Sequence, residues 1–209
     1  VDDLVGIGLR TAGPEEFRDM QTALKAAAVP FEVGSEELAI ERRVLELMLL
    51  RDPGGNPIEI FHGPMMSPNL PFYPARRRFG GFVTGAAGAG HLLIRHGGVA
   101  ESYEFYKLLG MRSASQFRVP LPGAPAPMAG KFMHCNVPGA REHTIAFGLP
   151  SVKSCNHLMI EVESIDDLMV TYQLVKDAGY PMMIDLGRHA NDEALSFYAM
   201  TPSGFAIEI

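Results

Sequence analysis

The apolar and polar positions of this chain fall into three blocks that repeat one order of elements. In segments 13–30 and 164–181, apolar residues recur every three or four positions behind an acidic first turn, and each pattern ends at a proline. A third helix is predicted over 99–110, where a glycine ends the pattern. Segments with strand-like sequence flank the predicted helices, for example at 91–97, 131–136 and 143–149. The pattern predicts three copies of a strand, a helix and then two or three more strands.

The first and third blocks also share a turn and a carboxylate. Residues 52–61 read DPGGNPIEIF and residues 201–209 read TPSGFAIEI, and in each a glutamate, Glu59 or Glu208, lies six positions after a proline. Repeats of this length can pair to close a curved sheet that one copy could not bury alone. The Pro-, Gly- and Arg-rich segment 64–88 is predicted to link two domains.

Composition excludes several classes of partner. The 209 residues carry a formal net charge of -6, which argues against a nucleic-acid or anionic-membrane surface. The one basic run, Arg76–Arg78, is too short to change this, and no apolar run has the length of a membrane span. The only two cysteines, Cys135 and Cys155, make no disulfide framework and suit a reducing cytoplasm. We expect a cytoplasmic protein without nucleic-acid or membrane partners.

Three strands each present one polar candidate ligand opposite an aliphatic row. In these strands His91, His157 and Glu208 face away from neighbouring Leu, Ile or Val residues. A carboxylate in an apolar strand is costly to bury unless a cation meets it. Two imidazoles and one carboxylate are the set that holds iron(II) and leaves coordination positions open. The competing interpretation is that each histidine is a structural residue, because no two candidates are close in sequence.

The first block lacks the histidine of this set. Aligning the helices offsets the copies by 151 positions, so Gly6 takes the place of His157 while Glu59 persists. We therefore expect this block to hold no metal and Glu59 to be solvated or locally paired.

The stretch from Gly187 to Glu208, GRHANDEALSFYAMTPSGFAIE, resembles the signature of the type I extradiol ring-cleavage dioxygenases. That signature is G-x-H, seven residues, an apolar residue and Tyr, then T-P-x-G and Glu. The strands GHLLI, KFMHCN, HTIAFGLP and NHLMIEV are also similar to those of the family, and RDPGGNPIEIFHG resembles the end of its N-terminal domain. The nearest resemblance is to the 2,3-dihydroxybiphenyl 1,2-dioxygenases.

The resemblance implies an α+β fold of paired βαβββ modules that form curved, barrel-like mixed sheets in two domains. Residues 1–63 would be the second module of a metal-free N-terminal domain, with 64–88 as the linker and 89–209 as a catalytic domain of two modules. The family has a further module before this one and a short tail after the Glu ligand, so we expect a fragment of a longer protein.

The resemblance also implies roles for single residues. The metal ligands would be His91, His157 and Glu208. His143 would be the active-site acid–base, with His189 and Tyr198 contacting the substrate oxygen and its surroundings. Residues that would line the ring pocket or support it are Phe132, Leu93, Asn156, Asn191 and Asp192.

The implied activity is cleavage of a bicyclic or substituted catechol by O2 at one Fe(II), with Mn(II) as the second choice. The product would be a 2-hydroxy-6-oxo-dienoate, and the protein would form a homo-oligomer. Biphenyl-, naphthalene-, cumate- and steroid-derived diols all stay open as substrates. Two other classes use the same module: glyoxalase-like metal isomerases or transferases, and metal-free proteins that bind an aromatic ligand.

Overall fold

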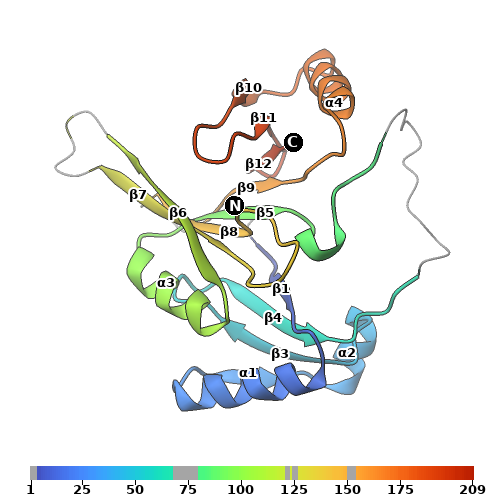
Figure 1. Cartoon of the computed structure of the whole chain (residues 1–209), viewed down its shortest axis with the longest axis vertical. Helices are drawn as coiled ribbons and strands as arrows, with labels where there is room; N and C mark the ends of the chain where they lie inside the picture. The colour runs from blue at the N-terminus through green and yellow to red at the C-terminus, as the bar shows by residue number, and fades with distance from the viewer. Residues whose placement is uncertain (1–3, 68–79, 121–122, 124–126, 150–153) are drawn as a thin grey trace. The chain divides into compact units, whose positions relative to one another are not determined.

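The computed structural model describes residues 4–67, 80–120, 123, 127–149 and 154–209 (Figure 1). The chain divides into two compact units, Leu4–Tyr73 and Pro74–Ile209. The basic run Arg76–Arg78 and the middle of the predicted linker lie outside the described residues.

The first unit is a four-stranded sheet with two helices. Its elements in chain order are β1 (Ile7–Arg10), α1 (Pro14–Ala26), β2 (Phe31–Val33), α2 (Glu36–Arg42), β3 (Glu46–Arg51) and β4 (Pro57–His62). The strand order is β1-β4-β3-β2, with β1 parallel to β4 and the other pairs antiparallel. Helix α1 begins at a proline, carries glutamates in its first turn and buries Phe17 and Leu24 completely, as the periodicity predicts.

Helix α2 was not predicted from the sequence. It is only seven residues long and begins at Ser35, whose hydroxyl accepts a hydrogen bond from the backbone N–H of Leu38 at 3.2 Å. The carboxylate of Glu59 accepts hydrogen bonds from Arg42 Nε at 3.0 and 3.1 Å, which confirms the expected local pairing.

The second unit contains two modules in one eight-stranded sheet. The first module consists of β5 (His91–Arg95), α3 (Val99–Leu108), β6 (Arg112–Val119), β7 (Met128–His134) and β8 (Ile145–Gly148). The second consists of β9 (Ser154–Met159), α4 (Ile165–Asp177), β10 (Met182–Arg188), β11 (Leu195–Met200) and β12 (Ala206–Glu208). A short 3-10 turn, η1 (Gly85–Ala87), precedes β5.

All three modules have the same topology. The sheet of the second unit runs β10-β11-β12-β9-β5-β8-β7-β6, so each module repeats the order β1-β4-β3-β2 of the first unit. In each module the first strand is parallel to the last, as β5 is to β8 and β9 is to β12. Antiparallel pairing of β5 with β9 joins the two modules of the second unit. The predicted curled mixed sheets of βαβββ modules are confirmed.

Each helix of the second unit packs on the strands of its own module. Helix α3 lies against β6, β7 and β8, where the rings of Tyr106 and Phe147 stack at 5.6 Å between centroids (Figure 1). Helix α4 lies against β11 through Leu168, which packs in a cluster with Phe197 and Ala199. These apolar layers hold the central strands in place, and the central strands carry the candidate ligands.

The segment before β5 is part of the second unit. The backbone N–H of Val83 donates to Glu161 O at 2.9 Å, and that of Glu163 donates to Gly81 O at 2.9 Å. The described end of the predicted linker, residues 80–88, is thus hydrogen bonded to residues 161–163, which follow β9. It leads directly into His91.

Two local features bring β5 and β9 together. A Cβ atom at Gly90 would lie 1.7 Å from Met159 O, so only glycine lets the start of β5 approach β9 this closely. Leu93 pairs with His157 but Ile94 pairs with Cys155, which leaves Asn156 as the extra residue of a β-bulge. The bulge lies directly beside a candidate ligand.

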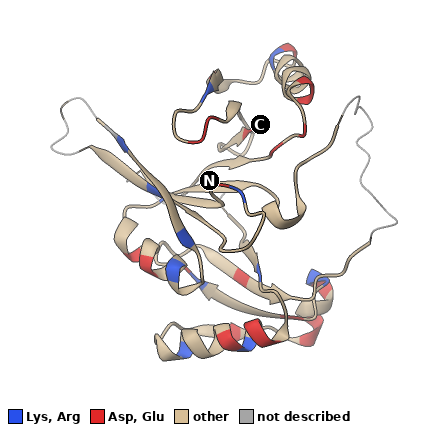
Figure 2. Cartoon of the chain, in the orientation of Figure 1, with Lys and Arg blue, Asp and Glu red and all other residues tan. Residues whose placement is uncertain are grey.

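Charged residues are mixed by sign over the described chain. Figure 2 shows acidic and basic residues interspersed along α1, α2 and α4. Within the described ranges, no helix is both long and apolar enough to cross a membrane.

Candidate metal centre

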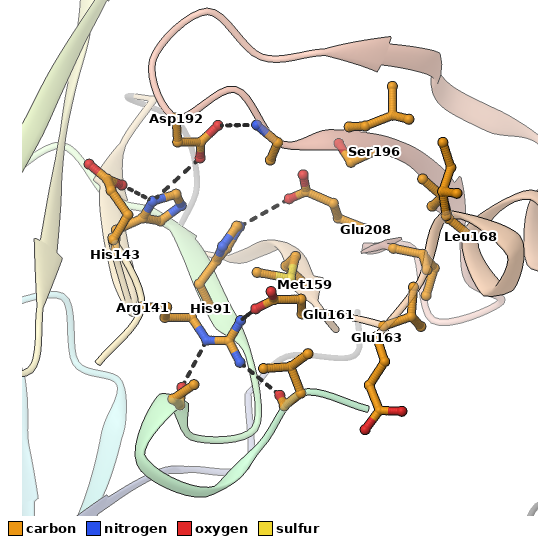
Figure 3. A pocket seen from close by; sticks show the side chains of 18 of the residues that line it. His91, Arg141, His143, Met159, Glu161, Glu163, Leu168, Asp192, Ser196 and Glu208 are labelled. Carbon is orange, nitrogen blue, oxygen red and sulfur yellow. Dashed lines mark hydrogen bonds and ion pairs between the residues drawn. The ribbon is translucent and has the colours of Figure 1, made fainter. Parts of the chain in front are cut away.

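The three predicted ligands converge on one point at the middle of the eight-stranded sheet. They come from three adjacent strands, because β9 lies between β5 and β12. His91 Nε2 lies 3.1 Å from His157 Nε2 and 3.0 Å from Glu208 Oε2, and His157 Nε2 lies 3.4 Å from that same oxygen (Figure 3). All three residues are at most 5% exposed.

This spacing fits a bound divalent cation. Three donors at right angles around an ion, each about 2.1 Å from it, would lie about 3.0 Å apart. Glu208 Oε2 accepts no well-aligned hydrogen bond in the described part of the chain, and His91 Nδ1 is likewise without a partner there. A buried carboxylate oxygen that faces two imidazole nitrogens lacks a hydrogen-bond partner among the described residues, and a bound metal ion would supply the missing interaction.

Burial and charge set the protonation of these ligands. Burial lowers the pKa of His157 to about 3, against a smaller opposing effect of Glu208, so its imidazole is neutral at pH 7. Burial acts to raise the pKa of Glu208, but its contacts with His91 and the charge of His157 outweigh this and lower it to about 2. A neutral imidazole and an ionised carboxylate are the forms that bind metals.

A second set of polar side chains surrounds His189, which follows the last residue of β10. Its Nε2 lies 3.0 Å from Tyr198 Oη, 3.0 Å from Ser196 Oγ and 3.3 Å from Glu208 Oε1. Tyr198 pairs across the strands with Glu208, which brings the phenol beside the carboxylate. Burial, and then the charge of Glu208, raise the pKa of Tyr198 well above its usual range. The phenol therefore stays protonated and is available as a donor.

His143 lies on the other side of His91. Its ring centroid is 4.2 Å from that of His91 and 4.5 Å from that of Phe132. Its Nδ1 donates to the carboxylate of Glu142, and Asp192 Oδ2 lies 3.8 Å from the same nitrogen. Burial, and then the charge of His91, lower the pKa of His143, while Glu142 and Asp192 oppose the shift. Its Nε2 is buried and has no hydrogen-bond partner among the described residues.

A cavity of about 630 Å³ opens onto this centre. Four of the predicted site residues line it: His91, His143, Asp192 and Glu208 (Figure 3). Its apolar wall comes from the strands, from α4 and from the segment before β5, and includes Val83, Met159, Val162, Leu168 and Leu195.

Comparison with known proteins agrees with this geometry. The family model described as Glyoxalase/Bleomycin resistance protein/Dioxygenase superfamily matches residues 88–209. Biphenyl-2,3-diol 1,2-dioxygenase of Sphingomonas paucimobilis is 45% identical over 208 residues, which cover 99% of this chain and 68% of that protein. Iron-dependent extradiol dioxygenase of Rhodococcus jostii (strain RHA1) is 38% identical over 214 residues, covering 99% of this chain and 69% of that protein.

The chain belongs to the extradiol dioxygenase family. A solved structure of catechol 2,3-dioxygenase superposes with a TM-score of 0.93 at 47% identity, covering 99% of this chain and 68% of that one. The family resemblance that the sequence motifs indicate is confirmed, and Fe(II) fits the convergent His-His-Glu set.

The extradiol family resemblance also implies a ring pocket, and the structure distributes those residues over several places. Phe132 contacts the ring of His143, and Leu93 is buried beside His157, its partner across the strands. Asn191 is exposed in the turn between β10 and β11. Of the five predicted residues, only Asp192 lines the large cavity.

Asn156 lies behind the metal ligand rather than on the large cavity. Its side-chain amide is 2.8 Å from His157 Nδ1, and it lines a smaller cavity of about 280 Å³ together with Arg95. When Nε2 of a histidine binds a metal, Nδ1 carries the proton and donates a hydrogen bond to a neighbouring acceptor. The bulge in β9 thus places a hydrogen-bonding group where it can orient His157.

The sequence analysis did not single out two residues of this site. Glu142 contacts His143 and lies just outside the predicted strand 143–149, and Ser196 contacts His189 and occupies a position that the signature leaves unspecified. The signal for Glu142 was its position directly before a candidate acid–base, since a carboxylate often orients a functional imidazole.

Proposed function

We propose that this protein cleaves a bicyclic or substituted catechol by O2 in the extradiol position, using one Fe(II) and giving a 2-hydroxy-6-oxo-dienoate. The observation that carries the proposal is the convergence of His91, His157 and Glu208, whose three donor atoms lie 3.0–3.4 Å apart in a buried site. When bound there, iron(II) supplies positions for both substrates and a route for electrons between them.

The ligand charges favour a singly deprotonated catechol. Two neutral imidazoles and one carboxylate contribute a charge of minus one, so a divalent cation leaves a net charge of plus one at the centre. A catechol that has lost one proton neutralises this charge, whereas a neutral catechol leaves a buried charge without compensation. The site therefore promotes loss of one catechol proton on binding.

In the proposed reaction, Tyr198 and His189 would stabilise the deprotonated oxygen. The phenol keeps its proton because its pKa is raised, so it can donate a hydrogen bond to that oxygen. His189 Nε2, 3.0 Å from the phenol oxygen, orients this donor and links it to Glu208 Oε1. Substrate binding would exchange one of these contacts for a contact to the catechol.

His143 is the acid–base of the proposed reaction. Its pKa is lowered, so the imidazole is neutral near pH 7 and accepts a proton at Nε2. Because this nitrogen has no partner among the described residues, no protein hydrogen bond must break before it acts. The imidazolium can then return the proton at a later step.

The apolar wall of the cavity suits an aromatic substituent. Val162, Leu168 and Leu195 contribute carbon surface within a volume that exceeds one catechol ring. The relative from Sphingomonas paucimobilis is named for a biphenyl diol, which carries such a second ring. We therefore propose a bicyclic or otherwise substituted catechol as the substrate class.

The test combines metal analysis with a colour assay. The protein is purified without oxygen, its iron content is measured, and 2,3-dihydroxybiphenyl is added in air. One iron per chain, O2 consumption and a yellow product support the proposal. Bound metal without O2 uptake would indicate an isomerase or transferase, and tight catechol binding without metal would indicate a ligand-binding protein.

A matched pair of histidine variants separates metal binding from folding. H157Q removes a predicted ligand and should abolish iron loading. H134Q changes a histidine whose Nδ1 hydrogen bonds only locally, to Cys135 O at 3.0 Å, and should load iron normally. Full iron content in H157Q would show that the ligand assignment is wrong.

We further propose that the protein acts in the cytoplasm as a homo-oligomer. Both cysteines are thiols rather than halves of a disulfide, which suits a reducing compartment. Light scattering on the purified protein measures the assembly directly, and a monomer at micromolar concentration would exclude it.

A further inference from the structure

The acid–base histidine of the proposed reaction has a carboxylate partner that no sequence motif or comparison assigns. Glu142 directly precedes His143 and accepts a hydrogen bond from its Nδ1 (Figure 3). Asp192 Oδ2 is the next oxygen, but at 3.8 Å it is beyond hydrogen-bond distance. The other oxygen of Asp192 accepts from the backbone N–H of Ala194 at 3.1 Å. Of the two carboxylates, only Glu142 contacts the imidazole proton directly.

The other contacts of His143 fix its plane but not the position of its proton. The rings of His91 and Phe132 pack against the imidazole in tilted contacts, at 4.2 and 4.5 Å between centroids. Ring packing of this kind has nearly the same energy whichever ring nitrogen carries the proton. The choice of tautomer is therefore left to the polar groups around the ring.

The two ring nitrogens meet opposite environments. Nε2 is buried without a hydrogen-bond partner in the described part of the chain, so a proton there would be an unsatisfied donor. The same tautomer would turn the Nδ1 lone pair toward the Glu142 carboxylate, which is repulsive. A proton on Nδ1 removes both penalties at once.

The adjacent cation does not compete for this carboxylate. The guanidinium of Arg141 contacts Glu161 and donates to the backbone oxygens of Val83 and Ala87 at 3.0 and 2.8 Å. Its side chain is 7% exposed, whereas that of Glu142 is 43% exposed. Glu142 thus contacts the histidine and lines the large cavity while its side chain stays partly exposed, which is not the setting of a residue that holds the fold together.

We propose that Glu142 is a positioning residue that keeps the proton of His143 on Nδ1 and so presents an unprotonated Nε2 to the substrate. The inference rests on the proposed function, in which His143 is the acid–base. It adds to that function a residue that acts on the substrate only through the histidine. By analogy with other enzymes, loss of such an orienting carboxylate slows turnover without removing the chemistry itself.

The first test reads the tautomer without using activity. The full chain is labelled with 15N-histidine and loaded with zinc(II), which is diamagnetic, and two-bond 1H–15N spectra are recorded at pH 8. The signals of His143 are assigned by their absence in H143Q. We expect the Nδ1–H form in the wild type, a shift toward the Nε2–H form in E142L, and recovery of the wild-type form in E142Q, whose amide oxygen can still accept.

Asp192 provides the matched comparison. D192N should leave the tautomer of His143 as in the wild type because its oxygen is too distant to hold the proton. An unchanged tautomer in E142L, or a shift caused by D192N instead, would overturn the proposal. These spectra decide the question even if the protein cleaves no catechol.

The second test uses the iron-loaded protein. E142L should lower kcat by about 10- to 100-fold with iron content close to wild type, because the residue is not among the three metal ligands and acts through His143. E142Q should restore most of the rate, which a merely structural role would not predict. E104Q, which changes an exposed glutamate on α3 paired with Lys107, should match the wild type. Equal kcat in E142L and wild type contradicts the proposal, whereas inactivity of the wild type itself contradicts the proposed function.

Discussion

Replacing Glu208 by glutamine should remove most of the stabilisation that the metal gives to the folded chain. A ligand that binds only the folded state stabilises it by about 4.1 kcal/mol at a free concentration 1,000 times its Kd. For a unit of this size, that corresponds to a rise in Tm of roughly 10–20 °C. Wild-type protein should show such a rise when iron(II) is added anaerobically to the metal-free chain.

The structure sets the size of the loss. Glu208 supplies one of three donors and the only negative charge among them, and it is 2% exposed, so water cannot take its place easily. Loss of an outer hydrogen-bond partner of a metal ligand costs 10–100-fold in affinity, so loss of a ligand itself should cost at least about 100-fold. At the same iron concentration this removes about 2.7 kcal/mol of stabilisation, or about two thirds of the total.

Scanning calorimetry with and without iron measures this difference, and Glu59 provides the control. Glu59 lies at the matching position of the first unit and pairs with Arg42 at 3.0 Å, with both side chains partly exposed. E59Q should therefore cost about 0–1 kcal/mol, equally with and without iron. A metal-induced rise in Tm that is as large in E208Q as in wild type would refute the assignment of Glu208 as a ligand.

Three further outcomes follow from the same site. H143A should slow turnover by at least ~100-fold while iron stays bound, and unchanged turnover would remove His143 from the mechanism. Y198F should lower kcat by about tenfold at constant iron content, since it removes one hydrogen bond of roughly 1.5 kcal/mol to a charged oxygen, and a normal rate would exclude that contact. The metal-free chain should lose stability on acidification below pH 6.5: the pKa of His157 is about 3 when folded and returns to its ordinary value of 6.5 on unfolding, so the unfolded chain takes up a proton that the folded chain does not. The loss from His157, about 1.4 kcal/mol per pH unit at most, is measured by Tm between pH 6.5 and 4.5 and would be contradicted by a flat profile in wild type. It should be smaller in H157Q, where His143, whose pKa is also lowered by burial, still contributes.

Strand alternation singled out His91, His157 and Glu208 as candidate ligands but left a structural role open for each histidine, and the family resemblance favoured the metal. In the structure these side chains come from three adjacent strands, and His91 Nε2 lies 3.0 Å from Glu208 Oε2. The helices were predictable for a similar reason, because 13-residue segments such as α1 and α4 show several turns of apolar periodicity.

Features that depend on short or long-range contacts were not predictable in this way. Helix α2 has only seven residues, so its pattern is too brief to distinguish from a loop. The position of Asn156 depends on a bulge in β9, which alternation assumes to be absent. The apolar wall of the cavity combines Leu168 of α4 with Val83 ahead of β5, and no local pattern relates two such distant segments.

The placement of the ligands on β5, β9 and β12 has a consequence for how the protein is assembled. The last ligand, Glu208, lies on β12, which pairs with both β9 and β11. The chain can therefore bind the ion tightly only after β12 has joined the sheet. Iron uptake during refolding would therefore report the completion of the central sheet, and a chain stalled before that step would stay devoid of iron however well its earlier helices had formed.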